Sequence, residues 1–350
     1  MKNRILSVLL AAVLLVGMMP VALAATELYS DVPEDHWSAE SVYRATELGI
    51  FKGIGDGKFG RGQPISRAAF VTALVRLFGW EAVTPEKPTF TDVESGRWYY
   101  DAVETAVSNG AIPVSSKTFR PSDELTRGEM AAMLMRALGY TSLAGSLADR
   151  PCPFTDVTVN RGFIIMAYDM GIVSGMGDGT FMPNASATRE QAAAILVRLY
   201  DKLMIESVQM TAVGMGVALR VETPKALSSD ELPTTPLEPI GALYDQLCAM
   251  KASGQDMSEV VLVLQAGGVS TVVTQGGSII SSNKVSVNHV NSVLARSNVR
   301  VYYSERYESA YCVYEPNYYQ TVTIWYQSEK SLEAKLQLAG MFGVTKYVLE

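Results

Sequence analysis

The sequence has few of the residues on which disulfides, metal sites and nucleic-acid binding depend. Only three cysteines (Cys152, Cys248 and Cys312) and two histidines occur in 350 residues. The cysteines are too few and too scattered for a disulfide framework or a zinc site, so we expect them to be small apolar core residues, and we expect neither metal nor cofactor. Basic residues are also scarce, because 29 Lys and Arg stand against 36 Asp and Glu. Such a balance argues against nucleic acid as a partner.

A long apolar run is found only near the start of the chain. Two basic residues precede an uncharged apolar run over 5–16, and the small residues ALA end it at 22–24. This order predicts a secretory signal peptide over 1–24. A membrane anchor is the alternative, but a span needs about 20 apolar residues, and Pro20 interrupts this run. After cleavage we expect a secreted protein without a transmembrane anchor.

What the chain does contain is an internal repeat, which should be sought before any other pattern. "YSDVPEDHW" at 29–37 recurs as "FTDVESGRW" at 90–98, and "FTDVTVNRG" at 154–162 echoes it. A second landmark keeps nearly the same period, with "PISRAAF" at 64–70, "ELTRGEM" at 124–130 and "SATREQA" at 186–192. Two landmarks with one period predict three copies of one structural unit.

Each copy is predicted to fold as helix, loop and helix. The loop is rich in Gly and Pro, and Ser66, Thr126 or Thr188 then takes the N-cap position of the second helix. Glu129 stands three residues after Thr126 and predicts a capping box, as does Gln191 after Thr188. One unit buries too little apolar surface to be stable alone, so we expect the three to pack around a shared axis.

An arginine follows each of these N-caps, at Arg67, Arg127 and Arg189. A cation is unfavourable there because a helix start carries roughly +0.5 of an elementary charge. An anionic ligand held by the guanidinium together with free backbone N–H groups would remove the conflict. The alternative is an ion pair with a carboxylate of the same repeat, for which the candidates are Asp31, Asp92 and Asp156.

The order F-x-D-V, Trp, G-I-x-x-G, D-G-x-F and T-R-A-E resembles the S-layer homology module, in copies over 27–80, 88–140 and 152–203. The resemblance implies an all-α, pseudo-threefold unit at the cell wall or S-layer. Its inter-repeat grooves would bind pyruvylated secondary cell-wall polysaccharide non-covalently, with the arginine and loop glycines holding the ketal carboxylate. On this basis the expected polysaccharide-binding residues are Asp31, Trp37, Gly53, Arg67, Asp92, Trp98, Arg127, Glu129, Asp156, Gly175 and Arg189, and none is catalytic.

The three copies differ at these positions, so the sequence leaves open which grooves bind. Copy one lacks the Glu of the motif, copy two has "VSSKTF" in place of the D-G loop, and copy three lacks the Trp. Burial as a helix anchor is favoured over sugar stacking for Trp37 and Trp98. The glycines are equally consistent with turns of positive φ. If the arginines serve binding, replacing one by Gln should leave the fold as stable as before, with Arg189 the most important for binding.

From residue 204 the period stops and the pattern becomes α/β. Apolar runs at 216–224, 258–268 and 343–349 predict strands, and 240–251 and 331–342 predict helices. Their alternation favours parallel pairing. The aromatic-rich segment 299–327 predicts a small antiparallel insertion, either packing a hairpin or stacking on sugars. Exposed strand edges leave self-association through 204–350 open.

The segment "TIWYQSEKSLEAKLQLAGMFGVTKYVL" is similar to the closing part of family-18 glycoside hydrolases, on Trp325, Tyr326, Ser331, Lys335, Gly343 and Val344, with Tyr347 where that family has Trp. The resemblance implies a partial (β/α) barrel. The family's catalytic D-x-x-D-x-D-x-E run is absent, and 147 residues are too few for a barrel of about 250. We therefore expect a non-catalytic domain, with a wall-tethered glycoside hydrolase as the alternative and Asp230, Glu231 and Glu238 as solvated loop charges. A purely structural lattice subunit would need larger array-forming domains.

Overall fold

The computed structural model describes residues 29–204, 209–210, 217–220, 240–264, 266–305 and 307–349. The expected signal peptide and the charged loop around Asp230 lie outside these residues. Two compact units divide between Tyr200 and Asp201. Each unit is described by itself.

Helices make up the regular structure of the first unit in its described residues. They are α2 (Ala39–Glu47), α3 (Arg67–Phe78), α4 (Tyr100–Ser108), α5 (Arg127–Ala137), α6 (Thr141–Ser146), α7 (Arg161–Asp169) and α8 (Arg189–Met204). The predicted N-caps are confirmed, because Ser66 accepts a hydrogen bond from the N–H of Ala69 and Thr126 forms a capping box with Glu129. The apolar face of α3 is buried as well, with Phe70 and Leu74 fully covered.

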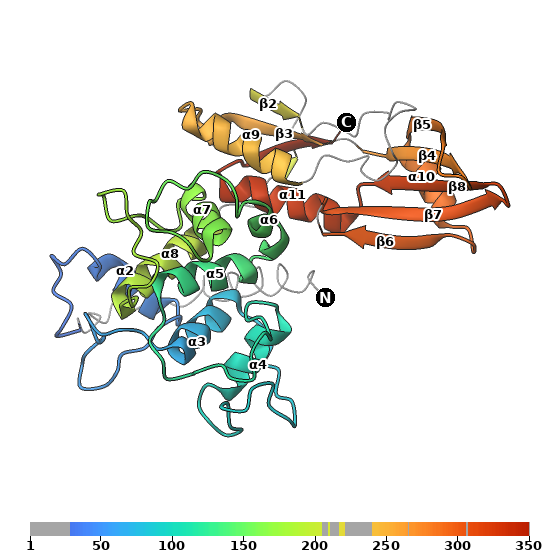
Figure 1. The fold of residues 1–350 in the computed structure, drawn as a ribbon. Coiled ribbons are helices and arrows are strands. Elements are labelled where there is room, and N and C mark those ends of the chain that lie inside the picture. Colours follow the sequence, from blue (N-terminus) through green and yellow to red (C-terminus); the bar gives the residue numbers. More distant parts are fainter. Residues whose placement is uncertain are drawn as a thin grey trace, which may run out of the picture. The chain divides into compact units, whose positions relative to one another are not determined.

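The three second helices, α3, α5 and α8, lie together at the centre of the first unit (Figure 1). Just before each start, a backbone hydrogen bond runs to the preceding copy in the cycle: Ile65 N to Ala187 O (2.9 Å), Ala187 N to Leu125 O (2.8 Å) and Leu125 N to Ile65 O (2.9 Å). The bonds close a cycle of three, and all three side chains are fully buried. The predicted packing around a shared axis is confirmed by this cycle.

The second unit contains a parallel sheet with strand order β1 (Gln209–Met210), β9 (Lys346–Leu349), β3 (Val260–Leu264) and β2 (Val217–Arg220). Each residue of β3 is buried, as its continuous apolar run requires. Helices α9 (Ile240–Ala252) and α11 (Glu329–Met341) belong to the same unit, and α11 contacts both α9 and β3. The predicted helices, the parallel pairing and the last strand are confirmed. The run at 216–224 is described only over its β2 residues.

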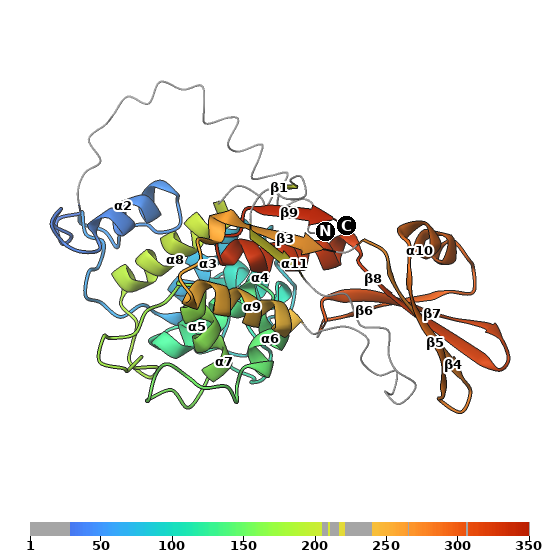
Figure 2. The same ribbon diagram turned by 90° about the horizontal axis from the view of Figure 1, so that it is seen from above.

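An antiparallel sheet of five strands completes the second unit (Figure 2). Its order is β5 (Ile279–Val285), β4 (Gly268–Thr274), β8 (Gln320–Tyr326), β7 (Ser309–Asn317) and β6 (Arg300–Ser304). The insertion is thus larger than predicted, because it starts at Gly268. Helix α10 (Val287–Leu294) covers one face, where Val290 and Val293 pack on Cys312 and Ile324.

The aromatic residues of this sheet pack in two ways. Tyr302, Tyr311 and Trp325 stack across neighbouring strands, with ring centroids 5.1 and 4.4 Å apart. Tyr318 and Tyr319, at the β7–β8 turn, are instead 78% and 72% exposed. The stacked aromatic residues therefore pack the sheet, whereas Tyr318 and Tyr319 at the turn do not.

A buried lysine joins α11 to the antiparallel sheet. Lys335 is 4% exposed, and its Nζ donates to Glu308 O (3.1 Å), Ser309 Oγ (3.2 Å) and Gln327 Oε1 (2.9 Å). Burial lowers the pKa of Lys335 to about 8. Lys335 of the predicted Ser-x-x-x-Lys helix thus fixes α11 to the antiparallel sheet. The four described parallel strands form a sheet with β1 and β2 at its ends, and the partial barrel is not confirmed.

Candidate functional site: the grooves between repeats

The arginine that starts each second helix reaches into the loop of the following repeat. Its Nε donates 2.9 Å hydrogen bonds to backbone carbonyls, from Arg67 to Phe119 O, from Arg127 to Phe181 O and from Arg189 to Phe59 O. We call the three resulting sites groove A (Arg67 with loop 112–120), groove B (Arg127 with loop 174–183) and groove C (Arg189 with loop 52–61). The arginines thus lie at equivalent interfaces, as the groove prediction requires.

Carbonyl oxygens and aromatic rings offset the charge conflict at these helix starts. In groove B, Arg127 Nη2 also donates to Ser174 O (2.9 Å), and the guanidinium lies 4.6 Å from the centroid of the Phe181 ring. In groove C, Arg189 Nη2 donates to Lys52 O (3.1 Å). The side chains of Arg67 and Arg127 are buried, at 9% and 8% exposure, and Arg189 is partly buried. Burial lowers the pKa of all three arginines, because each charge has lost much of its water.

The backbone N–H groups at the helix starts are not free, and this part of the sequence prediction is wrong. The N–H of Arg67 donates to Asp123 O, that of Arg127 to Ala185 O and that of Arg189 to Gln63 O, at 2.9–3.0 Å. Loop carbonyls of the neighbouring repeat use these donors because the repeats pack tightly there. A ligand in these grooves would meet the guanidinium without them.

The repeat-start aspartates hold the loops and do not pair with the arginines. Asp31 accepts from the N–H groups of Phe59, Gly60 and Arg61 at 2.8–2.9 Å. Asp92 accepts in the same way from the N–H groups of Phe119 and Arg120, and Asp156 from those of Phe181 and Met182. The alternative of an ion pair within one repeat is therefore wrong.

These loop contacts lower the pKa of Asp31 and of Asp156. The N–H bonds from Phe181 and Met182 lower the pKa of Asp156. For Asp31, partial burial raises the pKa, and the three N–H bonds outweigh it and lower the pKa overall. Each aspartate thus fixes the loop whose backbone carbonyls accept hydrogen bonds from an arginine, and does not itself contact that arginine.

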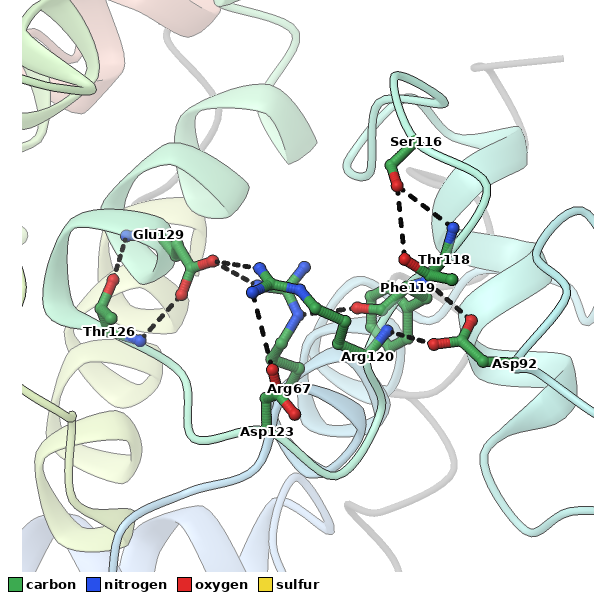
Figure 3. A network of polar contacts seen from close by, with 9 residues as sticks. All are labelled: Arg67, Asp92, Ser116, Thr118, Phe119, Arg120, Asp123, Thr126 and Glu129. Carbon is green, nitrogen blue, oxygen red and sulfur yellow. Dashed lines mark hydrogen bonds and ion pairs between the residues drawn. The ribbon is translucent and has the colours of Figure 1, made fainter.

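Groove A contains a network of charges (Figure 3). Arg67 Nη1 lies 2.7 Å from Glu129 Oε1, and Arg120 Nη2 lies 3.3 Å from the same oxygen. Arg120 also faces Asp123 at 3.6 Å. The other carboxylate oxygen of Glu129 accepts from the N–H of Thr126 at 3.0 Å. Two arginines and two carboxylates thus balance in this groove.

Beside this network lies a cavity of about 420 Å³. Its polar lining includes Arg136 and the hydroxyls of Ser115, Ser116 and Thr118, and its apolar lining includes Phe90. The loop "VSSKTF" that departs from the motif forms this hydroxyl-bearing wall. A cavity of this size, with hydroxyls on its walls, is chemically suited to a sugar.

The two tryptophans of the predicted site lie at the surface. Trp37 and Trp98 are 61% and 67% exposed, so the favoured prediction that they are buried is wrong. They precede the first turns of α2 and α4, which other side chains anchor. In the third repeat the equivalent residue is Gly162, where a side chain would overlap the carbonyl of Ala144 in α6. The α6 helix thus explains why the third copy has no Trp.

The predicted loop glycines serve close packing and not turns. Gly53 and Gly175 do not have positive φ. A side chain on Gly53 would lie 2.8 Å from both Lys58 O and the ring of Tyr29, and one on Gly175 would lie 2.8 Å from Thr180 O and overlap the ring of Phe154. The turn reading of these two positions is therefore wrong. Each glycine directly follows a residue whose carbonyl receives an arginine, Lys52 or Ser174.

Sequence reasoning missed the aromatic partners of the arginines and the second arginine of groove A. Phe59, Phe119 and Phe181 supply both the carbonyl and the ring at each groove. They are spaced as the arginines are, so a search for all positions with the same period would have found them. Arg120 gives no such signal, because its counterparts are Gly60 and Met182.

A comparison with protein families agrees with this architecture. The S-layer homology domain model matches residues 28–71, 89–131 and 153–193. The chain contains three S-layer homology domains. A "Cell surface protein" of Thermoanaerobacter kivui is 32% identical over 215 residues, which cover 59% of this chain and 26% of that protein. An "Amylopullulanase" of Thermoanaerobacterium thermosulfurigenes is 32% identical over 180 residues, 50% of this chain and 10% of that protein. The chain thus spans about a quarter or less of the length of these relatives.

Among solved structures, a GH18 chitinase from Cycas revoluta in complex with (GlcNAc)3 is similar at 17% identity, with 37% of this chain and 40% of that chain covered and a TM-score of 0.31. A score of this size does not assign a fold. Within the described residues, no helix is both long and apolar enough to cross a bilayer. The same part of the chain has no group of three or more His, Cys, Asp or Glu side chains that could hold a metal ion. The S-layer homology domains and these relatives indicate a cell-wall-anchored surface protein.

Proposed function

We propose that this chain anchors itself to the wall by binding a pyruvylated wall polysaccharide in the grooves between its S-layer homology domains, and that residues 204–350 are not catalytic. The observation that carries the proposal is the fixed guanidinium in each groove. A guanidinium has five N–H donors, and in groove B two of them go to Phe181 O and Ser174 O. Arg127 keeps further donors for a ligand carboxylate.

Placement of the charge supports an anionic ligand. A buried arginine at the start of a helix is unfavourable by both desolvation and the helix dipole. Within the described residues, no carboxylate lies within 4 Å of the guanidinium nitrogens of Arg127 or Arg189, whereas Arg67 has Glu129. A ketal-pyruvyl carboxylate would supply a charge-assisted contact in the two other grooves. Exposed Trp37 and Trp98 offer aromatic faces for neighbouring sugar rings.

The binding proposal is tested on the full chain with a control on the ligand side. Wall sacculi that carry ketal-pyruvyl groups are compared with the same sacculi after mild acid has removed them. We expect co-sedimentation of the chain with the first and a loss of at least about tenfold in affinity with the second, as for one or two lost charge-assisted bonds. Equal binding to both preparations would show that the carboxylate is not recognised.

The C-terminal proposal rests on the missing acidic run of the hydrolase family and on the position of its matching residues. Ser331 and Lys335 are buried and hydrogen-bonded to the protein, so neither is placed to act on a glycan. The similarity to an amylopullulanase does not decide whether this chain is an enzyme, because the matched residues make up only 10% of that protein. A reducing-sugar assay of the full chain on chitin and peptidoglycan should give no release, and sustained turnover would contradict the proposal.

A further inference from the structure

We infer that Glu129 is a built-in occupant of the carboxylate position of groove A, so that grooves B and C, and not groove A, take the acidic group of the wall polymer. The inference rests on the proposed function, because it says which grooves perform it. It is carried by the side-chain network of groove A and by the residues that replace Glu129 in the other two copies.

The Glu129 carboxylate is fully engaged. One oxygen accepts from Arg67 Nη1 at 2.7 Å and from Arg120 Nη2 at 3.3 Å, and the other accepts from the N–H of Thr126 at 3.0 Å. Figure 3 shows this carboxylate facing the two guanidinium groups. A carboxylate that meets an arginine at 2.7 Å makes the contact that a ligand acid would make. A ligand would have to displace Glu129, which remains tethered by the chain at high local concentration.

The other grooves lack this carboxylate. The counterpart of Glu129 is Gln191 in the third repeat, beside groove B, and Ala69 in the first, beside groove C. Gln191 keeps the capping role, since its Oε1 accepts from the N–H of Thr188 at 3.2 Å. Its amide is neutral and leaves the charge of Arg127 uncompensated at short range. Asp156 attracts Arg127, and Asp31 and Glu190 attract Arg189, only from beyond 4 Å within the described residues.

Groove A is blocked by charge and not by shape. Its cavity of about 420 Å³ is lined by Arg67, Arg120 and Glu129 together with serine and threonine hydroxyls. Removing the charge of Glu129 while keeping its size should therefore leave both room and cations for an acid. Glu129→Gln does this, and it retains the capping box because Gln serves that role as Glu does.

Two reciprocal substitutions test the inference, each copying a residue that the chain already uses at the same place. The probe is a glycoside that carries a ketal-pyruvyl group, titrated calorimetrically into the full chain, with the same glycoside lacking the pyruvyl group as control. We expect Glu129→Gln to bind one more equivalent of probe per chain than the unaltered protein, and Gln191→Glu to bind one fewer. A thermal melt of each variant checks that the domains remain folded.

The outcomes separate the inference from the proposed function. Unchanged stoichiometry in Glu129→Gln, or an unaltered protein that already fills all three grooves, overturns the inference while the function stands. If Glu129→Gln fails to fold, Gln191→Glu still decides, because unchanged binding in that variant overturns the inference too. Absence of probe binding to every protein, with sacculus binding that ignores pyruvylation, refutes the proposed function itself.

Discussion

Replacement of Arg127 by Gln should destabilise the first unit, although the sequence alone predicted no loss. Arg127 is 8% exposed, and it donates to Phe181 O and Ser174 O, both at 2.9 Å. Hydrogen bonds that involve a charged group contribute about 1.5–3 kcal/mol each, and the ring of Phe181 adds roughly 1 kcal/mol. Gln is shorter and can restore at most one of the two hydrogen bonds.

Two effects act in the other direction. Removing the cation relieves its opposition to the helix dipole, about 0.3–1 kcal/mol, and removes part of its desolvation cost. The net loss should be about 2–4 kcal/mol. For a unit of this size, 1 kcal/mol shifts the melting temperature by roughly 2–4 °C, so the expected shift is on the order of 10 °C.

Far-ultraviolet circular dichroism of the full chain measures this change, because helices dominate the first unit. The matched control is Arg97→Gln, which removes an exposed ion pair with Glu94 and should change stability by less than about 0.5 kcal/mol. If Arg127→Gln melts with the unaltered protein, the carbonyl contacts contribute nothing net and the arginine is held for binding alone. A drop equal to that of Arg97→Gln would refute the reasoning in the same way.

Two further predictions concern other parts of the chain. Gly175→Ala should destabilise the first unit by about 1–3 kcal/mol in a thermal melt, because the new methyl would overlap the ring of Phe154. The control is Gly145→Ala in α6, because Gly145 is exposed, has no positive φ and has no atom within 4 Å of an added methyl. In the second unit, the pKa of Lys335 is about 8 in the folded state against 10.5 in the unfolded state. Between these pH values the unfolded state binds more protons than the folded state. The free energy of unfolding should therefore rise by on the order of 2 kcal/mol as the pH goes from 8 towards 10. Chemical unfolding at several pH values should show this rise in the unaltered protein and not in Lys335→Met; a flat profile would mean that the lysine stays charged when buried.

Local signals in the sequence predicted the frame of the first unit well. The N-caps at Ser66, Thr126 and Thr188 depend only on residues a few positions apart, and all three are confirmed. The period of the repeat predicted a shared axis because no single copy can bury its own apolar face. The parallel strands of the second unit followed from their unbroken apolar runs.

Contacts between copies could not be predicted from such signals. The helix-start N–H groups were expected to be free, because nothing within one repeat binds them, and the carbonyls that do belong to the next repeat. Trp37 and Trp98 were expected to be buried as helix anchors, whereas both are exposed. Only α6, an insertion without a counterpart, covers the equivalent place in the third repeat.

The position of Glu129 shows how one fold can carry grooves of different charge. The residue three places after the N-cap contributes to the helix start only through the capping box, which Glu and Gln both complete. Helix α3, with Ser66 as its N-cap, has Ala69 at this place and no capping box. The capping role therefore constrains this position weakly. The arginine that faces it is constrained strongly, because its carbonyl contacts hold two repeats together. The position of Ala69, Glu129 and Gln191 can therefore vary, and its residue decides whether the guanidinium already has a carboxylate partner. The three copies can thus differ in ligand binding and keep their common packing.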